Sequence, residues 1–174
     1  MLLESAGLNA ASRVIDVGGG DSRLVDSLLD RGLEGITVLD ISPSAIARSQ
    51  DRLGARAAHV NWIVADVTAE WAAPTVDVWH DRAVFHFLVE QADRDRYVAR
   101  LRQPVTPGGH AAIATFAPDG PTKCSGLPVM RYSSETLTAQ LGHGFELVRS
   151  FTESHVTPMG TTQSFLFALF RVAA

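Results

Sequence analysis

An apolar run that stops at three consecutive glycines constrains the fold of this chain more than any other feature. Residues 14–17 (VIDV) precede the glycines at 18–20, and apolar residues then recur at helical spacing from Leu24 to Leu29. This pattern predicts a strand, a glycine turn and a helix. Glycine permits positive φ and close approach of a ligand to the main chain, and the first amides of a helix lack internal partners. We therefore expect a nucleotide-like ligand at this turn.

The spacing of the glycines bears on which nucleotide binds. A dinucleotide fingerprint has a further glycine three residues after Gly20, where this chain has Arg23. A dinucleotide is therefore disfavoured. A tight turn that binds nothing stays open as an alternative, because a glycine-rich turn by itself is weak evidence for a ligand.

The composition predicts one cytoplasmic domain spanning residues 1–174. A hydrophobic fraction of 46% with 20% charged residues is ordinary for a globular protein, and no apolar run reaches the length of a membrane span. The start of the chain has no secretory signal. A single cysteine, Cys124, excludes an internal disulfide and a multi-cysteine zinc site, and we expect no metal. The formal charge of −4 and the pI near 5.8 do not indicate the excess of positive charge that nucleic-acid binding requires.

Three further apolar segments each carry an acidic residue at or beside their end. They are 37–41 with Asp40, 60–66 with Asp66, and 76–81 with Asp81. Helical patterns alternate with such segments, which predicts a parallel sheet covered on both faces. Because the carboxyl ends of parallel strands meet at one edge of a sheet, ligands gather there.

The second half of the chain continues this alternation and then departs from it. Helices are predicted at 93–102 and 133–141, and a fifth strand at 110–116, after the Pro-Gly-Gly at 107–109. Residues 117–132 predict a long functional loop. The last two segments, 145–153 and 163–172, have only a turn at 157–160 between them, so we expect an antiparallel hairpin.

Five motifs in this order resemble those of the class I methyltransferases that use S-adenosylmethionine. They are DVGGG at 16–20, VLDIS at 38–42, VADV at 64–67, DVWHDRAVFHFL at 77–88 and PGGHAAIATF at 107–116. Each is weak alone, but five in register cover nearly the whole chain. The resemblance, to small bacterial members of the class, implies a three-layer, Rossmann-like α/β sandwich. Its seven-stranded, mostly parallel sheet would end in a C-terminal antiparallel hairpin.

The resemblance implies which residues hold the methionine and ribose parts of S-adenosylmethionine, and of S-adenosylhomocysteine as the product. Gly18, Gly19 and Gly20 would line the methionine part, and Asp16 would help to hold its ammonium group. Asp40 would accept hydrogen bonds from both ribose hydroxyls, which are donors that a carboxylate can bind in pairs. Structural roles stay open for these acids: helix capping for Asp40, and bonds to loop amides for Asp16.

The adenine and methyl group have their own implied neighbours. Ile41 and Val67 would lie against the adenine, and Asp66 would accept a hydrogen bond from its amino group. Asp66 could instead cap a helix or stay solvated. Asp81 and Arg82 would sit by the methyl group. Arg82 could bind a substrate carboxylate, although we favour an ion pair with Asp81.

Methyl transfer to a protonated nucleophile also needs a base. We consider Asp81, His80 and His86 as catalytic candidates, because they lie on or just after the fourth strand. A neutral imidazole is suited to removing a proton. The alternative for either histidine is a buried ring that packs and bonds to backbone.

The remaining candidates would contact the substrate, and they follow the fifth strand. They are Lys123, Cys124, Arg131, Tyr132 and His155, together with Arg82 before it. A lysine beside a cysteine can favour the thiolate. A small, half-buried role for Cys124 stays open.

Two departures from the usual class I pattern affect the interpretation. Members of this class usually have helical sequence before the first strand, whereas few residues precede Asp16 here. We therefore expect either a truncated chain or a lid supplied by a partner subunit, as in a homodimer. The motif Asn-Pro-Pro-Tyr is absent after the fourth strand, where residues 81–84 read DRAV, which favours an acceptor other than adenine or glutamine amides.

The expected function is transfer of a methyl group to a small acceptor, such as a thiol or carboxylate. Three alternatives stay open. A protein-lysine methyltransferase would share every cofactor residue and differ in an open acceptor cleft. A non-catalytic domain would bind S-adenosylmethionine without transfer. An NAD-dependent oxidoreductase would keep the sheet, but it would need the further glycine and would not end in a hairpin.

Overall fold

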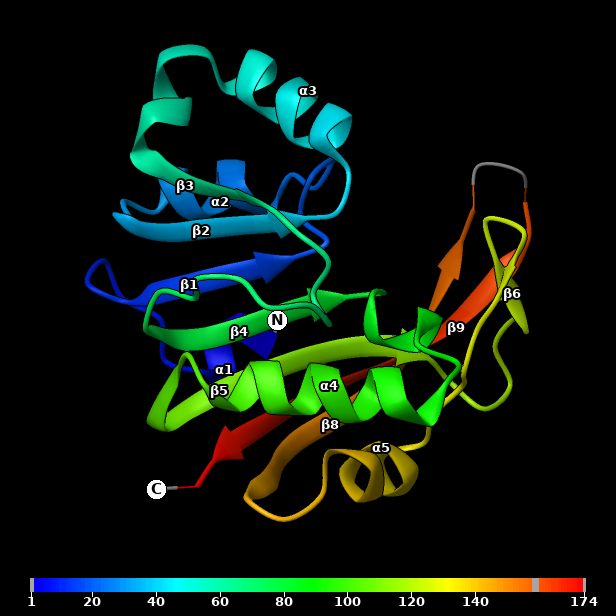
Figure 1. Ribbon diagram of the computed structural model, residues 1–174. Helices are drawn as coiled ribbons and strands as arrows, with labels where there is room; N and C mark the ends of the chain where they lie inside the picture. Colours follow the sequence, from blue (N-terminus) through cyan, green and yellow to red (C-terminus); the bar gives the residue numbers. More distant parts are fainter. Residues whose placement is uncertain (1, 158–159, 174) are drawn as a thin grey trace.

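A seven-stranded sheet forms the centre of the computed structural model, which describes residues 2–157 and 160–173 (Figure 1). The strand order is β3-β2-β1-β4-β5-β9-β8. The strands are β1 (Arg13–Val17), β2 (Gly35–Asp40), β3 (Val60–Val64), β4 (Val76–Arg82), β5 (Val105–Phe116), β8 (Phe145–Val156) and β9 (Thr162–Val172). β1 to β5 run parallel, and β9 pairs antiparallel with both β5 and β8. The mostly parallel sheet and the closing hairpin are confirmed; Pro158 and Met159 of the predicted turn lie outside the described residues.

Helices cover both faces of this sheet, which confirms the three-layer α/β sandwich (Figure 1). One face packs against α1 (Leu2–Ser5), α2 (Leu24–Asp30) and α3 (Pro43–Leu53), and the other against α4 (Gln91–Arg102) and α5 (Ser134–Leu141). Two short 3₁₀ helices are η1 (Gly54–His59) and η2 (Phe85–Phe87). Val14 and Ile15 of β1 belong to opposite core clusters because successive strand side chains point to opposite faces.

The local signals for α3 explain how the chain leaves β2. Ser42 caps the helix by accepting a hydrogen bond from the amide of Ala45, and Pro43 occupies the first turn, where no amide donor is needed. The predicted inner stripe of this helix is buried: Ala45, Ile46, Ser49 and Leu53. This packing sets α3 against the carboxyl end of β2.

The connection between β3 and β4 departs from the expected alternation, because residues 65–75 form no helix. Trp71 instead packs against Trp79 of β4, with the ring centroids 6.3 Å apart. Pro74 stands near the end of this short connection, where it disfavours helix. The α4 face of β2 and β3 therefore has only a loop over it.

The long loop predicted at 117–132 contains a small hairpin instead. Strands β6 (Lys123–Cys124) and β7 (Leu127–Pro128) pair antiparallel across Ser125 and Gly126. Both turn residues have positive φ, 49° and 82°, as tight two-residue hairpin turns require. The hairpin lies beside the outer part of β8 and β9 in Figure 1.

The predicted boundary at 107–109 is also wrong, because β5 begins at Val105 rather than at His110. The pairing of β4 with β5 shifts register between Val76 and Val78, so the Pro-Gly-Gly segment forms an irregularity inside the strand. No helix within the described ranges has the length and apolarity that a membrane crossing requires.

Candidate ligand-binding site at the carboxyl end of the sheet

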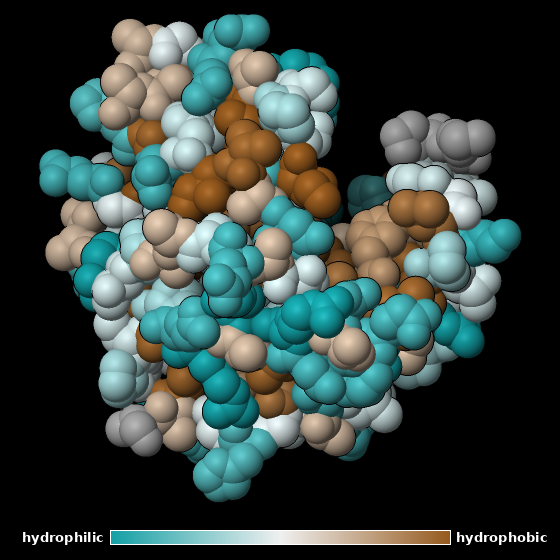
Figure 2. All heavy atoms as spheres, viewed as in Figure 1, coloured by the Kyte–Doolittle hydropathy of each residue, from teal (hydrophilic) through white to brown (hydrophobic). Residues whose placement is uncertain are grey.

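A cleft of about 700 Å³ opens at the carboxyl ends of β1, β2 and β3. Residues 82–84 and 87–89, together with Leu127 and Pro128 of β7, close its other side. Figure 2 shows this side of the molecule hollowed between the part that carries α3 and the part that carries the two hairpins. The predicted place for a ligand is therefore hollow.

The walls of the cleft are apolar and unusually accessible. Ile41 is 68% exposed and Leu127 is 59% exposed, and both line the cleft with the buried Val67. Large aliphatic side chains that remain uncovered around a concavity mark a binding site better than scattered ones do. A flat, apolar ring system fits between such walls.

Two carboxylates stand at the edge of these walls. Asp40 accepts hydrogen bonds from the amides of Gly20 (2.9 Å) and Ser42 (2.8 Å). Asp66 uses one oxygen, Oδ1, to accept from the amide and hydroxyl of Thr68, both at 2.8 Å. A carboxylate can accept about four hydrogen bonds, so each acid shapes its own loop and keeps accepting capacity for a ligand.

The glycine turn is packed between three elements, which explains its composition. Gly18 has φ +70°, and a Cβ there would overlap Val84. A Cβ on Gly20 would lie 2.7 Å from Oδ2 of Asp40. The hydroxyl of Ser49 in α3 donates to the carbonyl of Gly20. The turn is therefore fixed rather than loose.

Asp16 lies beneath this turn with one oxygen unsatisfied. The residue is 2% exposed, and its Oδ1 lies 2.7 Å from Nδ1 of His80. Its Oδ2 is buried without a hydrogen-bond partner and would lie 2.5 Å from a Cβ on Gly19. A buried carboxylate oxygen is costly unless a donor meets it, so this position suits a cationic group held at the turn.

Asp81, which we predicted to contact the methyl group or to act as a base, has its carboxylate engaged by neighbouring groups. Its side chain is fully buried and accepts hydrogen bonds from the amides of Val84 (2.8 Å) and Phe85 (3.0 Å) and from the hydroxyl of Tyr97 (2.6 Å). Burial raises the pKa of Asp81 to about 6, against the lowering effect of the Tyr97 hydrogen bond. Asp81 therefore shapes the segment that lines the cleft.

The predicted ion pair between Asp81 and Arg82 is also absent. Arg82 is exposed and makes no hydrogen bond or ion pair with the described residues. Its position is shared by the cleft and by a second, neighbouring cavity. Arg82 is thus available to an anionic ligand.

His86 is not an accessible base either. The ring is fully buried, stacks on Phe116 with the centroids 4.8 Å apart, and has no hydrogen-bond partner at either nitrogen. Burial lowers the pKa of His86 to about 4. The alternative role for His86, a buried ring that forms a hydrogen bond to the backbone, is also not observed, because no described residue forms a hydrogen bond with either ring nitrogen.

Most of the predicted substrate contacts lie away from both carboxyl-end cavities. Tyr132 is buried against Phe85, with 5.5 Å between the ring centroids, and burial raises its pKa. The others sit on or beside the hairpins without lining either cavity: Lys123, Cys124, Arg131 and His155. Leu127 and Pro128 line the cleft in place of Lys123 and Cys124.

Arg94 is a residue that the sequence analysis missed. It is 7% exposed on the inner face of α4 and donates to the carbonyls of Leu88 and Val89, each at 2.8 Å, and to the side chain of Gln140. It thereby fixes the rim of the cleft. Its signal was available, since Arg94 stands three residues before Tyr97 on the stripe that faces the core.

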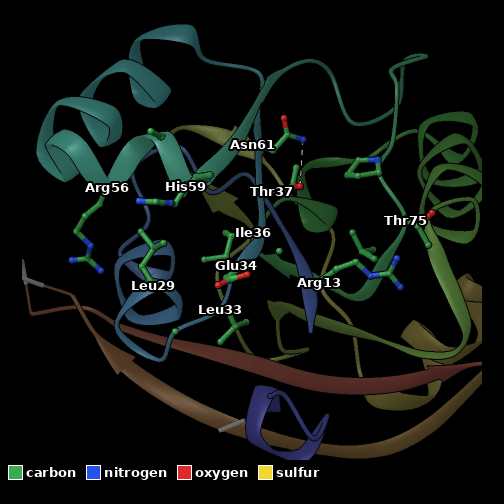
Figure 3. A pocket seen from close by; sticks show the side chains of 16 residues that line it. Arg13, Leu29, Leu33, Glu34, Ile36, Thr37, Arg56, His59, Asn61 and Thr75 are labelled. Carbon is green, nitrogen blue, oxygen red and sulfur yellow. Dashed lines mark hydrogen bonds between the residues drawn. The ribbon is translucent and has the colours of Figure 1, made fainter. Parts of the chain in front are cut away.

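A larger cavity lies elsewhere, at the amino ends of β1, β2 and β3, and measures about 940 Å³ (Figure 3). Arg13 and Arg56 lie on opposite sides of it in Figure 3, where Asn61 points toward Thr37. Arg13 pairs with Asp77 at 2.8 Å, and Arg56 pairs with Asp30 at 2.6 Å. None of the described residues lining it has a buried side-chain nitrogen or oxygen without a hydrogen-bond partner.

Comparisons with known proteins show the family to which this chain belongs. A family model described as a methyltransferase domain matches residues 15–111. Nodulation protein S of Rhizobium tropici is 28% identical over 115 residues, which cover 66% of this chain and 48% of that protein. This chain spans about half the length, or less, of the curated relatives that it matches.

Solved structures show the same fold. The N-methyltransferase NodS from Bradyrhizobium japonicum superposes with a TM-score of 0.79 at 20% identity, covering 99% of this chain and 93% of that one. The 1,6-didemethyltoxoflavin-N1-methyltransferase of Burkholderia thailandensis, solved with S-adenosylhomocysteine, gives a TM-score of 0.76 at 21% identity. The aligned parts cover 99% of this chain and 75% of that protein.

Proposed function

Because the chain belongs to a methyltransferase domain family, we propose that it transfers a methyl group from S-adenosylmethionine to a small-molecule acceptor. One observation carries this proposal: the carboxylates of Asp40 and Asp66 flank the exposed Ile41 above a glycine turn. This arrangement matches a nucleoside, which has a flat base and two vicinal hydroxyls. The exposure of Ile41 is otherwise unfavourable.

The residues of the cleft fit the adenosine part of this cofactor. Ile41 and Val67 offer apolar surface to the adenine, and the free Oδ2 of Asp66 can accept from its amino group. Asp40 retains lone pairs for the ribose hydroxyls while it holds Gly20 and Ser42.

The methionine part would extend over the glycine turn. The unsatisfied Oδ2 of Asp16 beneath Gly19 is placed to compensate a positive ammonium group. Bound S-adenosylmethionine supplies an activated methyl group on a sulfonium. The protein then has to align the acceptor with that methyl group and exclude water. Val84, held by Asp81, and Leu127 of β7 are placed to limit solvent at the cleft.

We infer a small-molecule acceptor rather than nucleic acid, because the chain carries a net charge of −4 and its cleft is lined mostly by apolar residues. The cytoplasm remains our expected location, since the one cysteine of this sequence gives no disulfide framework.

Titration calorimetry tests the proposal on the purified chain. We expect S-adenosylmethionine and S-adenosylhomocysteine to bind in a one-to-one ratio and NAD to give no signal. S-adenosylhomocysteine-loaded protein should unfold at a higher temperature, because a ligand that binds only the native state stabilises it. Binding of NAD alone, or of none of the three compounds, would overturn the proposal.

A further inference from the structure

A second cavity, here called the back cavity, adjoins the proposed cofactor cleft. This back cavity measures about 500 Å³ and lies at the carboxyl end of β4 and β5, on the face covered by α1 and α2. Leu2 and Leu3 of α1 line it together with Phe151 of β8 and Phe167 of β9. Arg82 lines both this cavity and the cofactor cleft, so the two hollows adjoin.

His80 presents its ring to the back cavity in a fixed orientation. Its Nδ1 lies 2.7 Å from Oδ1 of the buried Asp16, and its side chain is 17% exposed. The other nitrogen, Nε2, makes no hydrogen bond with the described residues. It is also not one of their buried atoms that lack a partner, so it is open to the cavity. If Nδ1 donates its hydrogen to the carboxylate, Nε2 has a free lone pair.

The position of Asp16 connects His80 to the transfer site. Its Oδ1 holds His80, whereas its unsatisfied Oδ2 lies under the glycine turn where the cofactor's ammonium group would bind. One carboxylate thus adjoins both the imidazole and the cofactor position. A group in the back cavity next to His80 is therefore close to that position.

We propose that the back cavity receives the methyl acceptor and that Nε2 of His80 removes the proton of its nucleophilic N–H or O–H group. This inference rests on the proposed function. In the step, a lone pair of the acceptor forms a bond to the methyl carbon. The methyl–sulfur bond breaks with its electron pair remaining on sulfur, which gives S-adenosylhomocysteine, and the acceptor's proton moves to Nε2.

The lining of the back cavity identifies the class of acceptor. Phe151 and Phe167 stack against each other, with 5.2 Å between centroids and 12° between planes, and both contribute aromatic surface to the cavity. Arg23 and Arg82 also line the cavity, and their side chains make no hydrogen bond or ion pair with the described residues. An aromatic ring with a carboxylate or similar anion meets both features, since guanidinium groups bind carboxylates in pairs of hydrogen bonds.

Two acidic residues among the described ones line this cavity, Asp81 and Glu153. The carboxylate of Asp81 accepts hydrogen bonds from Val84 and Tyr97, whereas the side chain of Glu153 makes no hydrogen bond. The balance of two free cations against one free anion favours an acceptor with one negative charge. The acceptor class is therefore an aromatic monoacid that also carries an amine, hydroxyl or ring N–H.

The first test measures binding to the full chain loaded with S-adenosylhomocysteine. Anthranilate, 4-hydroxybenzoate and indole-3-carboxylate serve as probes in titration calorimetry. We expect at least one to bind, and Arg23→Ala to weaken it at least fivefold. Arg56→Ala, at the amino-end cavity, should leave the affinity within twofold. Failure of all three probes, or equal affinity in Arg23→Ala, overturns the acceptor class.

The second test measures turnover of the bound probe with S-adenosylmethionine. His80→Ala and His80→Asn should both lower kcat by 10²- to 10⁴-fold, the usual contribution of a positioned base, with KM for the probe within threefold. His80→Asn retains an N–H donor for Asp16 and so guards against simple misfolding. Added imidazole should partly restore kcat in His80→Ala.

The matched control is His59→Ala, a histidine at the amino-end cavity, which should retain full kcat. His59→Ala and His80→Asn, which keeps a donor for Asp16, should each bind S-adenosylhomocysteine as the unaltered chain does. If the unaltered chain binds no S-adenosylhomocysteine, the proposed function itself has failed. If it does bind and His80→Asn retains full kcat, or no probe is methylated, only the present inference is overturned.

Discussion

The two ends of the sheet differ in how completely their polar groups are paired. The amino end has the larger cavity, about 940 Å³, yet its arginines are engaged by Asp77 and Asp30 (Figure 3). The carboxyl end has two smaller cavities, of about 700 and 500 Å³. There Asp16 keeps an unsatisfied oxygen, and Arg82 has no partner within the described ranges.

This contrast indicates that unmet hydrogen-bonding capacity, rather than volume, locates the functional end. A folded chain satisfies most of its buried polar groups, so each exception needs a reason. At the amino end a loop, not a helix, connects β3 to β4 and leaves open space. The described side chains that line this space have no buried polar atom without a partner. At the carboxyl end the parallel strands bring acids and helix beginnings together.

The largest expected effect comes from a pair of glycines, one at each end, that both have positive φ. Gly18→Ala combines left-handed strain with an overlap on Val84, for a loss of about 2 to 5 kcal/mol in unfolding free energy. Gly32→Ala, beside the amino-end cavity, has open space and should lose only about 1 to 2 kcal/mol. Urea denaturation of both variants measures the difference, and equal losses would contradict the packing of the turn.

The next prediction concerns how stability depends on pH at the two ends. The pKa of Asp81 is raised to about 6 in the folded state. Between pH 4 and pH 6 the folded chain therefore keeps a proton on Asp81 that the unfolded chain has lost, so stability falls as pH rises through this range. The lowered pKa of His86, about 4, has the opposite sign: stability falls as pH drops from about 6.5 to 4. The two slopes should largely cancel in the unaltered chain.

Single variants should separate these slopes. In His86→Phe, the unfolding free energy should rise by about 3 kcal/mol between pH 6 and pH 4, because Asp81 then titrates without the opposing contribution of His86. In Asp81→Asn it should fall over the same window, as measured by urea denaturation at each pH. At the amino end, Arg13 lowers the pKa of Asp77, so that pair loses its contribution only below pH 4. Parallel curves for all three chains would refute this assignment.

The smallest of the three effects concerns affinity. Asp40→Ala should weaken S-adenosylhomocysteine binding by about 2 kcal/mol, roughly 30-fold, because it removes charge-assisted hydrogen bonds. Glu34→Ala removes an exposed carboxylate that lines the amino-end cavity and should leave the affinity unchanged. Calorimetry compares the two variants. Equal affinity in Asp40→Ala would remove this residue from the proposed site.

Much of the architecture could be predicted from the sequence because its signals are local. A strand that ends in Asp40, a helix capped as at Ser42, and a final pair of strands too close for a crossover are each readable from a few residues, although β3 ends at Val64, two residues before the predicted Asp66. The parallel topology then brings the strand ends together by a general rule. The small hairpin at Ser125 and the missing helix before β4 were not readable, since neither has a strong periodic pattern.

The roles around β4 were harder to predict. Asp81 and His80 are neighbours in the chain, yet one turns into the core toward Tyr97 and the other toward Asp16 on the opposite face. Alternation along the strand gives opposite faces, but it does not say which face is buried deeply enough to change a carboxyl group's role.

The sequence by itself determined the order of the seven main strands, the glycine turn and the acids at or near the strand ends, because these depend on local periodicity and chain connectivity. Only the tertiary structure decided that Asp16 meets His80, 64 residues away, because that contact depends on the register of β1 against β4. It also decided that Leu2 and Phe167, from opposite ends of the chain, line one cavity. Packing between distant elements sets such contacts, and no short stretch of sequence encodes it.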